Sequence, residues 1–313
     1  MAAPFAWLGT RIGYYRIRED LSVDLDHLIA SADEHTKLVL VPQYFGHLRS
    51  VRELREHSLK RGWTLVEDCA HAFFALGSSN QIGCDSDFVV ASSSKFFAAF
   101  DGGVLASRSH VVPSAPRAQS LSAEIRTAIN AVEYAFEYGR LLHLRQIVTP
   151  LLERARRFRP VSDGSRSTSD LASRFGGVEF EPESVEMRAT RVARWLATRG
   201  DRMGIARARR DNWKAMRERL SRSARLSFPI PELGDRSVPY VLAVEIPEPE
   251  RVFPELKRQG VPVYRWETAF DASAEVACHV SARFRQTLIQ LPCHQGLTPT
   301  ERNWIADMIL SVV

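Results

Sequence analysis

The fold class follows from Lys37-Leu-Val-Leu-Val-Pro42, a short, continuous apolar run that predicts a strand buried on both faces, as in parallel sheets. Apolar residues then recur at helical spacing between positions 48 and 61, and Gly62 follows where a helix would end. A second strand, Trp63-Thr-Leu-Val66, comes directly after this glycine. The strand, helix, strand order suits a right-handed parallel connection and therefore predicts an α/β fold.

Further apolar runs extend the predicted sheet in both directions. Phe88-Val-Val-Ala91 and Val104-Leu-Ala106 predict strands downstream, and Gly13-Tyr-Tyr-Arg-Ile17 predicts one upstream, preceded by a turn at Gly9-Thr10. From about residue 118 to 158 the apolar positions take helical spacing. The first half of the chain is thus predicted to combine a mostly parallel sheet with flanking helices.

The second half predicts a smaller α/β domain. Residues 159–176 are rich in Ser, Gly and Asp and predict a flexible loop, so we expect domains at 1–175 and 176–313. Residues 184–220 predict an arginine-rich helical region whose arginines form a solvated face. The remaining sequence predicts strands over 238–246, 261–266 and 288–291, and helices over 250–259 and from Thr298 onward.

Composition excludes several classes of function. The 313 residues carry a net charge of +5 without any block of like charge, which argues against a nucleic acid partner. The four cysteines lack the spacing of a zinc site or a disulfide framework, so we expect no metal and reduced thiols in a cytoplasmic protein. No signal sequence or long apolar segment is present, which argues against export and membrane spanning.

Polar residues that could carry chemistry follow the predicted strands. They are Asp68, His71, Ser92 and Lys95. In open α/β sheets, ligands bind beyond the carboxyl ends of the strands. Pyridoxal phosphate requires a lysine amine, a carboxylate for its ring nitrogen and donors for its phosphate, and these residues offer all three. Singly, each has a common structural explanation as a helix cap, a solvated lysine or a core histidine.

Four sequence segments in a fixed order make a stronger combination. It resembles the DegT/DnrJ/EryC1/StrS family of fold-type-I, pyridoxal-phosphate-dependent sugar aminotransferases. The segments are Pro42-Gln-Tyr-Phe45-Gly46, Glu67-Asp68-Cys69-Ala70-His71, Lys95 followed by Asp101-Gly102-Gly103, and Leu291-Pro-Cys-His-Gln-Gly-Leu-Thr-Pro-Thr-Glu301.

The resemblance implies a role for each candidate residue. Lys95 would form the Schiff base with pyridoxal 5′-phosphate and shuttle the proton during transfer. Asp68 would hold the pyridine nitrogen, and His71 would lie beside the ring or its 3′-oxygen. Ser92 would donate to the phosphate, with Ser93 or Ser94 as alternatives.

The resemblance also implies an activity: transfer of an amino group, from glutamate, to a keto-sugar, expected to be nucleotide-linked, by a homodimer. Two departures keep an alternative open. The chain is expected to lack the N-terminal part of the large domain, which supplies a phosphate-binding helix N-terminus, and the segment before Lys95 is serine-rich rather than aromatic-rich. The alternative is a degenerate or truncated member with a structural or partner-subunit role. A nicotinamide-dependent oxidoreductase is disfavoured because no Gly-x-Gly-x-x-Gly follows a strand.

Overall fold

The computed structural model describes residues 2–75, 83–99, 101–112, 117–137, 149–150, 180, 182–266 and 278–313. The chain forms two compact units, one of residues 1–10, 97–103 and 114–200, and the other of 11–96, 104–113 and 201–313. The loop predicted over 159–176, and the domain boundary expected after it, lie outside the described residues.

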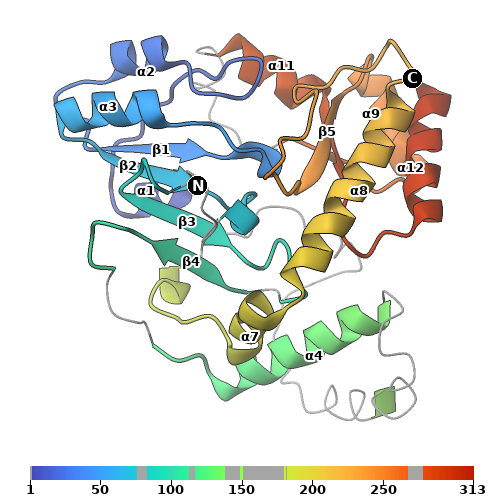
Figure 1. The fold of residues 1–313 in the computed structure, drawn as a ribbon, viewed down its shortest axis with the longest axis horizontal. Coiled ribbons are helices and arrows are strands. Elements are labelled where there is room, and N and C mark those ends of the chain that lie inside the picture. Colours follow the sequence, from blue (N-terminus) through green and yellow to red (C-terminus); the bar gives the residue numbers. More distant parts are fainter. Residues whose placement is uncertain are drawn as a thin grey trace. The chain divides into compact units, whose positions relative to one another are not determined.

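A four-stranded sheet carries the predicted site residues. Its strands β1 (Leu38–Pro42), β2 (Thr64–Asp68), β3 (Phe88–Ser92) and β4 (Gly103–Ala106) lie side by side in that order (Figure 1). β1 pairs with β2, and β2 with β3, in parallel, which confirms the predicted parallel sheet. Pro42 lies opposite Asp68, and Asp68 opposite Val90, so these three strands end at one edge of the sheet.

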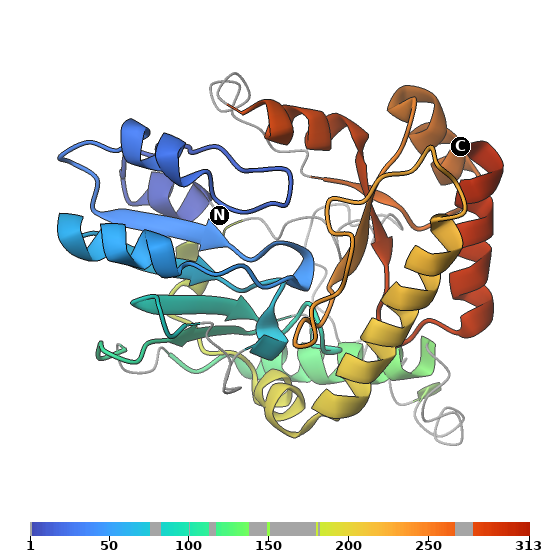
Figure 2. The ribbon, with the colours of Figure 1, turned by 45° about the horizontal axis from the view of Figure 1, so that its top comes forward.

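Two helices, α2 (Leu25–Ser31) and α3 (Arg52–Arg61), cover the same face of this sheet (Figure 2). The core beneath them includes Leu28 and Leu54 from the helices and Val39 and Leu65 from the strands. α3 ends as predicted, because Gly62 takes the left-handed conformation at φ 68° and its N–H donates to the carbonyl of Ser58.

The strand predicted over Gly13–Ile17 is wrong. Only one isolated bridge forms there, between Ile17 and Val23. The chain turns back immediately, since the Leu21 N–H donates to the Arg18 carbonyl and Leu21 has a φ of 66°. Because the chain reverses so soon, the segment pairs with no strand among the described residues apart from the bridge between Ile17 and Val23.

The C-terminal region contains a second sheet, antiparallel throughout, in the order β5 (Val241–Glu245), β7 (Leu288–Pro292), β6 (Tyr264–Arg265). The strand predicted over 261–266 is therefore shorter than expected. Among the described residues, four helices accompany this sheet: α8 (Arg202–Leu220), α9 (Pro249–Arg258), α11 (His279–Thr287) and α12 (Pro299–Val312). Figure 1 shows α8 and α12 packed side by side.

The closing helix begins where the sequence predicts it. Thr298 and Glu301 exchange side-chain and backbone hydrogen bonds in a capping box, with Pro299 at the first helical position. The C-terminal region thus contains the mixture of strands and helices that the sequence predicts.

The other compact unit contains α1 (Ala2–Trp7), α4 (Leu121–Glu137), a short 3₁₀ turn η3 (Pro182–Ser184) and α7 (Arg191–Arg199). α4 packs against α7. The side chain of Asp101 accepts hydrogen bonds from the N–H and hydroxyl of Thr190, the residue that caps α7. The helical region predicted over 184–220 is divided at Gly200, where Asp201 caps the next helix.

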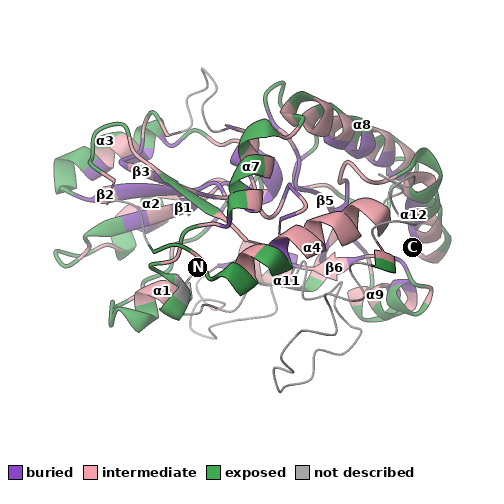
Figure 3. Ribbon diagram, turned by 90° about the horizontal axis from the view of Figure 1, so that it is seen from below, coloured by how far each residue is buried: buried purple, intermediate pink, exposed green. Residues whose placement is uncertain are grey.

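Burial follows the sheets. Figure 3 shows buried residues concentrated in β1, β2 and β5, with exposed residues along the outer helices. None of the helices in the described ranges is both long and apolar enough to cross a membrane.

Candidate active site

The acidic pair at the end of β2 divides into two environments because neighbouring strand residues face opposite sides of a sheet. The Glu67 carboxylate is 1% exposed and accepts hydrogen bonds from Gln43 Nε2 at 2.8 Å, and from Gly83 N and Ser86 Oγ at 2.9 Å each. These three donors engage both of its oxygens. Glu67 is therefore a structural carboxylate.

Asp68 is buried but much less satisfied. Its Oδ1 accepts the Ala70 N–H at 2.9 Å, and no other hydrogen bond to this carboxylate occurs in the described part of the chain. Burial raises the pKa of Asp68, while the Ala70 N–H and the charge of Lys95 oppose that rise. Asp68 ends β2, and Lys95 follows the end of β3, the neighbouring parallel strand.

Lys95 and His71 contact each other directly. Lys95 Nζ lies 2.8 Å from His71 Nε2, and on the other side of the imidazole the Phe45 N–H reaches Nδ1 at 3.4 Å. The imidazole stacks on the Tyr240 ring with centroids 4.4 Å apart, and Lys95 Nζ lies 5.3 Å from the centre of the same ring. Burial first, and Lys95 second, hold the pKa of His71 well below its ordinary value.

Ser92 ends β3, at the same sheet edge, and its hydroxyl lies 2.8 Å from that of Ser94. Ser93 between them is buried. Among the described residues, Ser92 has no hydrogen bond to Asp68, His71 or Lys95. The structure thus brings Lys95 and His71 into contact, places Asp68 within their electrostatic reach, and leaves Ser92 at the edge beside them.

Sequence reasoning missed Arg209, because the prediction of a solvated arginine face is wrong at this position. Arg209 is 3% exposed, and its guanidinium donates to the carbonyls of Lys95 at 3.4 Å and Tyr240 at 3.1 Å, and to Gln295 Oε1 at 2.9 Å. Gln295 Nε2 in turn donates to the Phe96 carbonyl at 2.8 Å. Together, Arg209 and Gln295 hold the backbone on which Lys95 sits.

A signal for Arg209 did exist in the sequence. Asn212, Trp213 and Met216 follow it at helical spacing, and all of them are buried on the same side of α8. An arginine in line with such a row faces the interior and needs carbonyl partners there.

The aromatic and glycine loop after β1 is the 3₁₀ turn η1 (Tyr44–Gly46), and it is held by backbone contacts. Phe45 takes a left-handed φ of 58°, and its carbonyl accepts the Tyr240 N–H at 2.8 Å. Gly46 has φ 89°, and a Cβ there would lie 2.3 Å from the Val238 carbonyl oxygen. Only glycine fits this approach, which fixes where the Phe45 N–H points.

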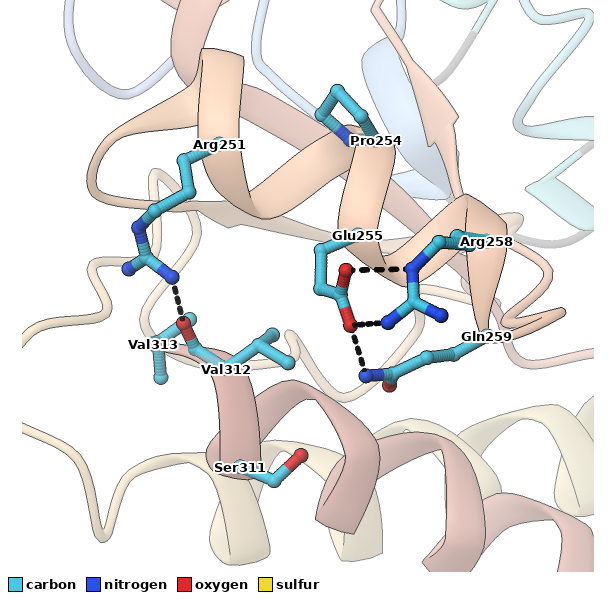
Figure 4. A pocket seen from close by; sticks show the side chains of 8 residues that line it. All are labelled: Arg251, Pro254, Glu255, Arg258, Gln259, Ser311, Val312 and Val313. Carbon is cyan, nitrogen blue, oxygen red and sulfur yellow. Dashed lines mark hydrogen bonds and ion pairs between the residues drawn. The ribbon is translucent and has the colours of Figure 1, made fainter.

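Two pockets lie away from these residues. One, of about 720 Å³, is lined by α9 and the end of α12 (Figure 4). Its charged groups are already paired: Arg251 donates to the Val312 carbonyl, and Glu255 accepts from Arg258 and Gln259. The other, of about 380 Å³, is lined by residues 47–49 and by 232–235 and Ser237. Neither is lined by Asp68, His71, Ser92 or Lys95.

The chemistry of the site fits the cofactor that the sequence resemblance implies. Lys95 supplies an amine, and Asp68 supplies a buried carboxylate with one oxygen that accepts no hydrogen bond among the described residues. Such a carboxylate favours a cationic N–H partner, because an ion pair offsets the cost of burial. Serine hydroxyls at the end of β3 add donors for a phosphate.

Solved structures of aminotransferases share this fold. The aminotransferase TlmJ from Streptoalloteichus hindustanus aligns with a TM-score of 0.65 and 21% identity, over 99% of this chain and 75% of that one. The sugar aminotransferase CalS13 from Micromonospora echinospora gives 0.62 and 16% identity over 99% and 76%. PseC from Helicobacter pylori, an aminotransferase involved in the biosynthesis of pseudoaminic acid, gives 0.64 and 15% identity over 99% and 76%.

The chain thus spans about three quarters of the length of each of these proteins. Among curated proteins it has no match. The structural alignments confirm the predicted fold of type I pyridoxal-phosphate transferases, a mostly parallel sheet with a small antiparallel one. Residues 2–120 match the model of the DegT/DnrJ/EryC1/StrS aminotransferase family, which contains three of the four segments on which the resemblance rests. Over these residues the chain is similar to the DegT/DnrJ/EryC1/StrS aminotransferase family.

Proposed function

We propose that this chain is a pyridoxal-phosphate-dependent aminotransferase of the sugar aminotransferase type. The observation that carries the proposal is the contact of Lys95 Nζ with His71 Nε2 at 2.8 Å, within electrostatic reach of the buried Asp68 carboxylate. An amine and a carboxylate that follow adjacent parallel strands are two of the groups that this chemistry demands.

When bound, the cofactor supplies an aldehyde and a protonated ring that takes up electron density from the substrate carbon. The Lys95 amine would bind the aldehyde carbon and carry the proton that moves during transfer. Asp68 would keep the ring nitrogen protonated, since a buried carboxylate favours a cationic donor. His71 would lie beside the ring or its 3′-oxygen, and Ser92, Ser93 or Ser94 would donate to the phosphate.

The proposed substrates are a keto-sugar that carries a nucleotide and an amino donor such as glutamate. The support is the family match over residues 2–120, together with similarity in fold to a protein described as a sugar aminotransferase. We also propose that the chain acts as a homodimer.

One observation favours a second candidate, a degenerate member with a structural or partner-subunit role. Neither of the pockets of about 720 Å³ and 380 Å³ is lined by Lys95. Beside Lys95 itself, the Tyr240 ring packs against His71. A chain of this second kind would keep the fold without holding the cofactor.

Titration of the purified chain with pyridoxal phosphate separates the two candidates. We expect a visible absorption band that borohydride bleaches, with the reduced adduct located on Lys95 by peptide mass spectrometry. Lys95→Ala should abolish the band. Lys257→Ala is a matched control, because Lys257 Nζ also lies 5.3 Å from a tyrosine ring but outside the site.

Addition of L-glutamate should then change the spectrum and release 2-oxoglutarate in the intact protein. A chain that forms no adduct at Lys95 would support the degenerate role. If the adduct forms but glutamate does not change its spectrum, the chain binds the cofactor and glutamate is not the amino donor.

A further inference from the structure

The loop Tyr44–Gly46 contacts the imidazole of His71, and this contact has a chemical consequence for Lys95. The Phe45 N–H donates to His71 Nδ1 at 3.4 Å, so Nδ1 is a hydrogen-bond acceptor and carries no proton. A neutral imidazole has one N–H, which then lies on Nε2. The Phe45 backbone amide therefore selects the tautomer of His71.

The selected proton points at Lys95. Nε2 lies 2.8 Å from Lys95 Nζ, so Nε2–H donates and the amine must accept with its lone pair. An ammonium group has no lone pair and would place two donors against each other at this distance. Only the neutral amine satisfies both contacts of the imidazole.

The loop that sets this arrangement cannot easily turn away. The Phe45 carbonyl is tied to the Tyr240 N–H at 2.8 Å, and Gly46 permits the backbone to approach the Val238 carbonyl. The imidazole is also packed, since it lies nearly parallel to the Tyr240 ring at 4.4 Å and to the Phe45 ring at 6.2 Å between centroids, with interplanar angles of 18°. The ring therefore has little freedom to flip and exchange its two nitrogens.

We propose that the Phe45 amide and His71 act as positioning residues that hold the Lys95 amine in its neutral, nucleophilic form before any carbonyl compound arrives. The catalytic value of a neutral Lys95 amine rests on the proposed function, because a neutral amine is the form that attacks a carbonyl carbon. It concerns only the protonation of the chain's own residues.

The other groups around the amine act in both directions. Asp68 on β2 favours a positive amine, whereas burial raises the pKa of that carboxyl and so weakens its charge. Arg209 on α8, which donates to the Lys95 carbonyl, repels a second positive charge. Tyr240 contributes a neutral phenol, because burial raises its pKa to about 12.

The test is competitive acetylation of the cofactor-free chain over pH 6 to 11, followed at each lysine by mass spectrometry. The comparison lysine is Lys257, which has the same 5.3 Å separation from a tyrosine ring but contacts no imidazole in the described part of the chain. We expect the labelling midpoint of Lys95 to lie at least about one pH unit below that of Lys257. In His71→Gln the amide can turn its oxygen toward the ammonium, so the midpoint should rise toward that of Lys257.

His47→Gln makes the same change at another buried histidine and should leave the Lys95 midpoint where it was. A Lys95 midpoint equal to that of Lys257, or unchanged in a folded His71→Gln variant, would overturn the inference. Should His71→Gln fail to fold, long-range ¹⁵N–¹H correlation on the unmutated chain decides directly. A proton on Nε2 at pH 7 supports the inference, and a proton on Nδ1 or on both nitrogens refutes it.

The result is separable from the proposed function. A low Lys95 midpoint in a chain that takes up no pyridoxal phosphate would leave the tautomer inference standing and remove the aminotransferase. An ordinary midpoint in a chain that binds the cofactor would do the reverse.

Discussion

Asp68 and its neighbour Glu67 show how one position along a strand changes the role of a carboxylate. Glu67 has three hydrogen-bond donors, whereas Asp68 has one and keeps an oxygen that accepts none among the described residues. Removing the charge at Asp68 should therefore cost binding of a cationic ring nitrogen rather than folding. We expect Asp68→Asn to weaken pyridoxal phosphate binding about 10- to 100-fold, the worth of a charge-assisted hydrogen bond.

Absorbance titration measures that loss, and Asp26→Asn on the exposed surface of α2 provides the control. Unchanged affinity in Asp68→Asn would show that this carboxylate does not face the ring nitrogen. Thermal unfolding of both variants should stay close to that of the unmutated chain.

His47 predicts an acid sensitivity. Burial, and then Arg49, lower its pKa from 6.5 to about 3, so the folded chain keeps this imidazole neutral. Below pH 6.5 the unfolded chain binds a proton that the folded chain does not, and stability falls as the pH drops from about 6.5 toward 3. Between pH 7 and 5 the loss from this one group is about 2 kcal/mol.

Urea unfolding at pH 7 and pH 5 tests this, with His47→Gln as the variant. The variant should lose about 2 kcal/mol less than the unmutated chain between these pH values, because glutamine does not titrate. His71, whose pKa is also lowered, should keep part of the acid sensitivity in both proteins. Equal losses in the two proteins would contradict a buried, neutral His47.

Residue types and strand order were sufficient to predict that Asp68, His71 and Lys95 would gather at one sheet edge, since parallel strands end together. Their roles toward a cofactor stay a prediction. The residues that hold the Lys95 backbone lie in the other half of the chain, so local sequence patterns could not predict them. Arg209 and Gln295 reach the Lys95 backbone through tertiary packing alone.

At the scale of elements, the turn η1 is the connection most sensitive to substitution. Gly46→Ala would combine a left-handed φ of 89° with a Cβ only 2.3 Å from the Val238 carbonyl oxygen. We expect a loss of at least about 3 kcal/mol in the free energy of unfolding, because the conformational cost adds to a backbone shift. Urea unfolding at pH 7 measures it.

Gly62→Ala is the matched comparison for that loss. Gly62 has a similar left-handed φ of 68°, but a Cβ there meets nothing within 4 Å. Its substitution should cost only about 1 kcal/mol, the conformational part alone. Equal losses at the two glycines would mean that the close approach at Gly46 is not rigid.

Elements with strong local signals were predicted correctly, and those defined by long-range contacts were not. The apolar runs of β1 to β3 and the capping box of α12 can be recognised from the local sequence alone. The segment Gly13–Ile17 has strand-like residues, but the chain reverses at Leu21 before a ladder can form. Strand propensity alone could not show that reversal.

At the scale of the whole molecule, β4 is the strand that we expect to take part in association. It is the outer strand of the four-stranded sheet, and its Val104 and Leu105 side chains are 36% and 46% exposed. An edge strand with apolar side chains and unpaired backbone groups favours association with another chain. We therefore expect a homodimer at micromolar concentration, measured by sedimentation equilibrium.

Leu105→Lys should shift that equilibrium toward monomer, because a charge on an edge strand opposes pairing and burial. Leu59→Lys, at an exposed leucine of α3, is the control and should leave the dimer intact. A monomeric unmutated chain at ten micromolar would remove the dimer from the proposal. A dimer that persists in Leu105→Lys would place the interface on a surface other than β4, since a buried lysine at the contact would cost several kcal/mol.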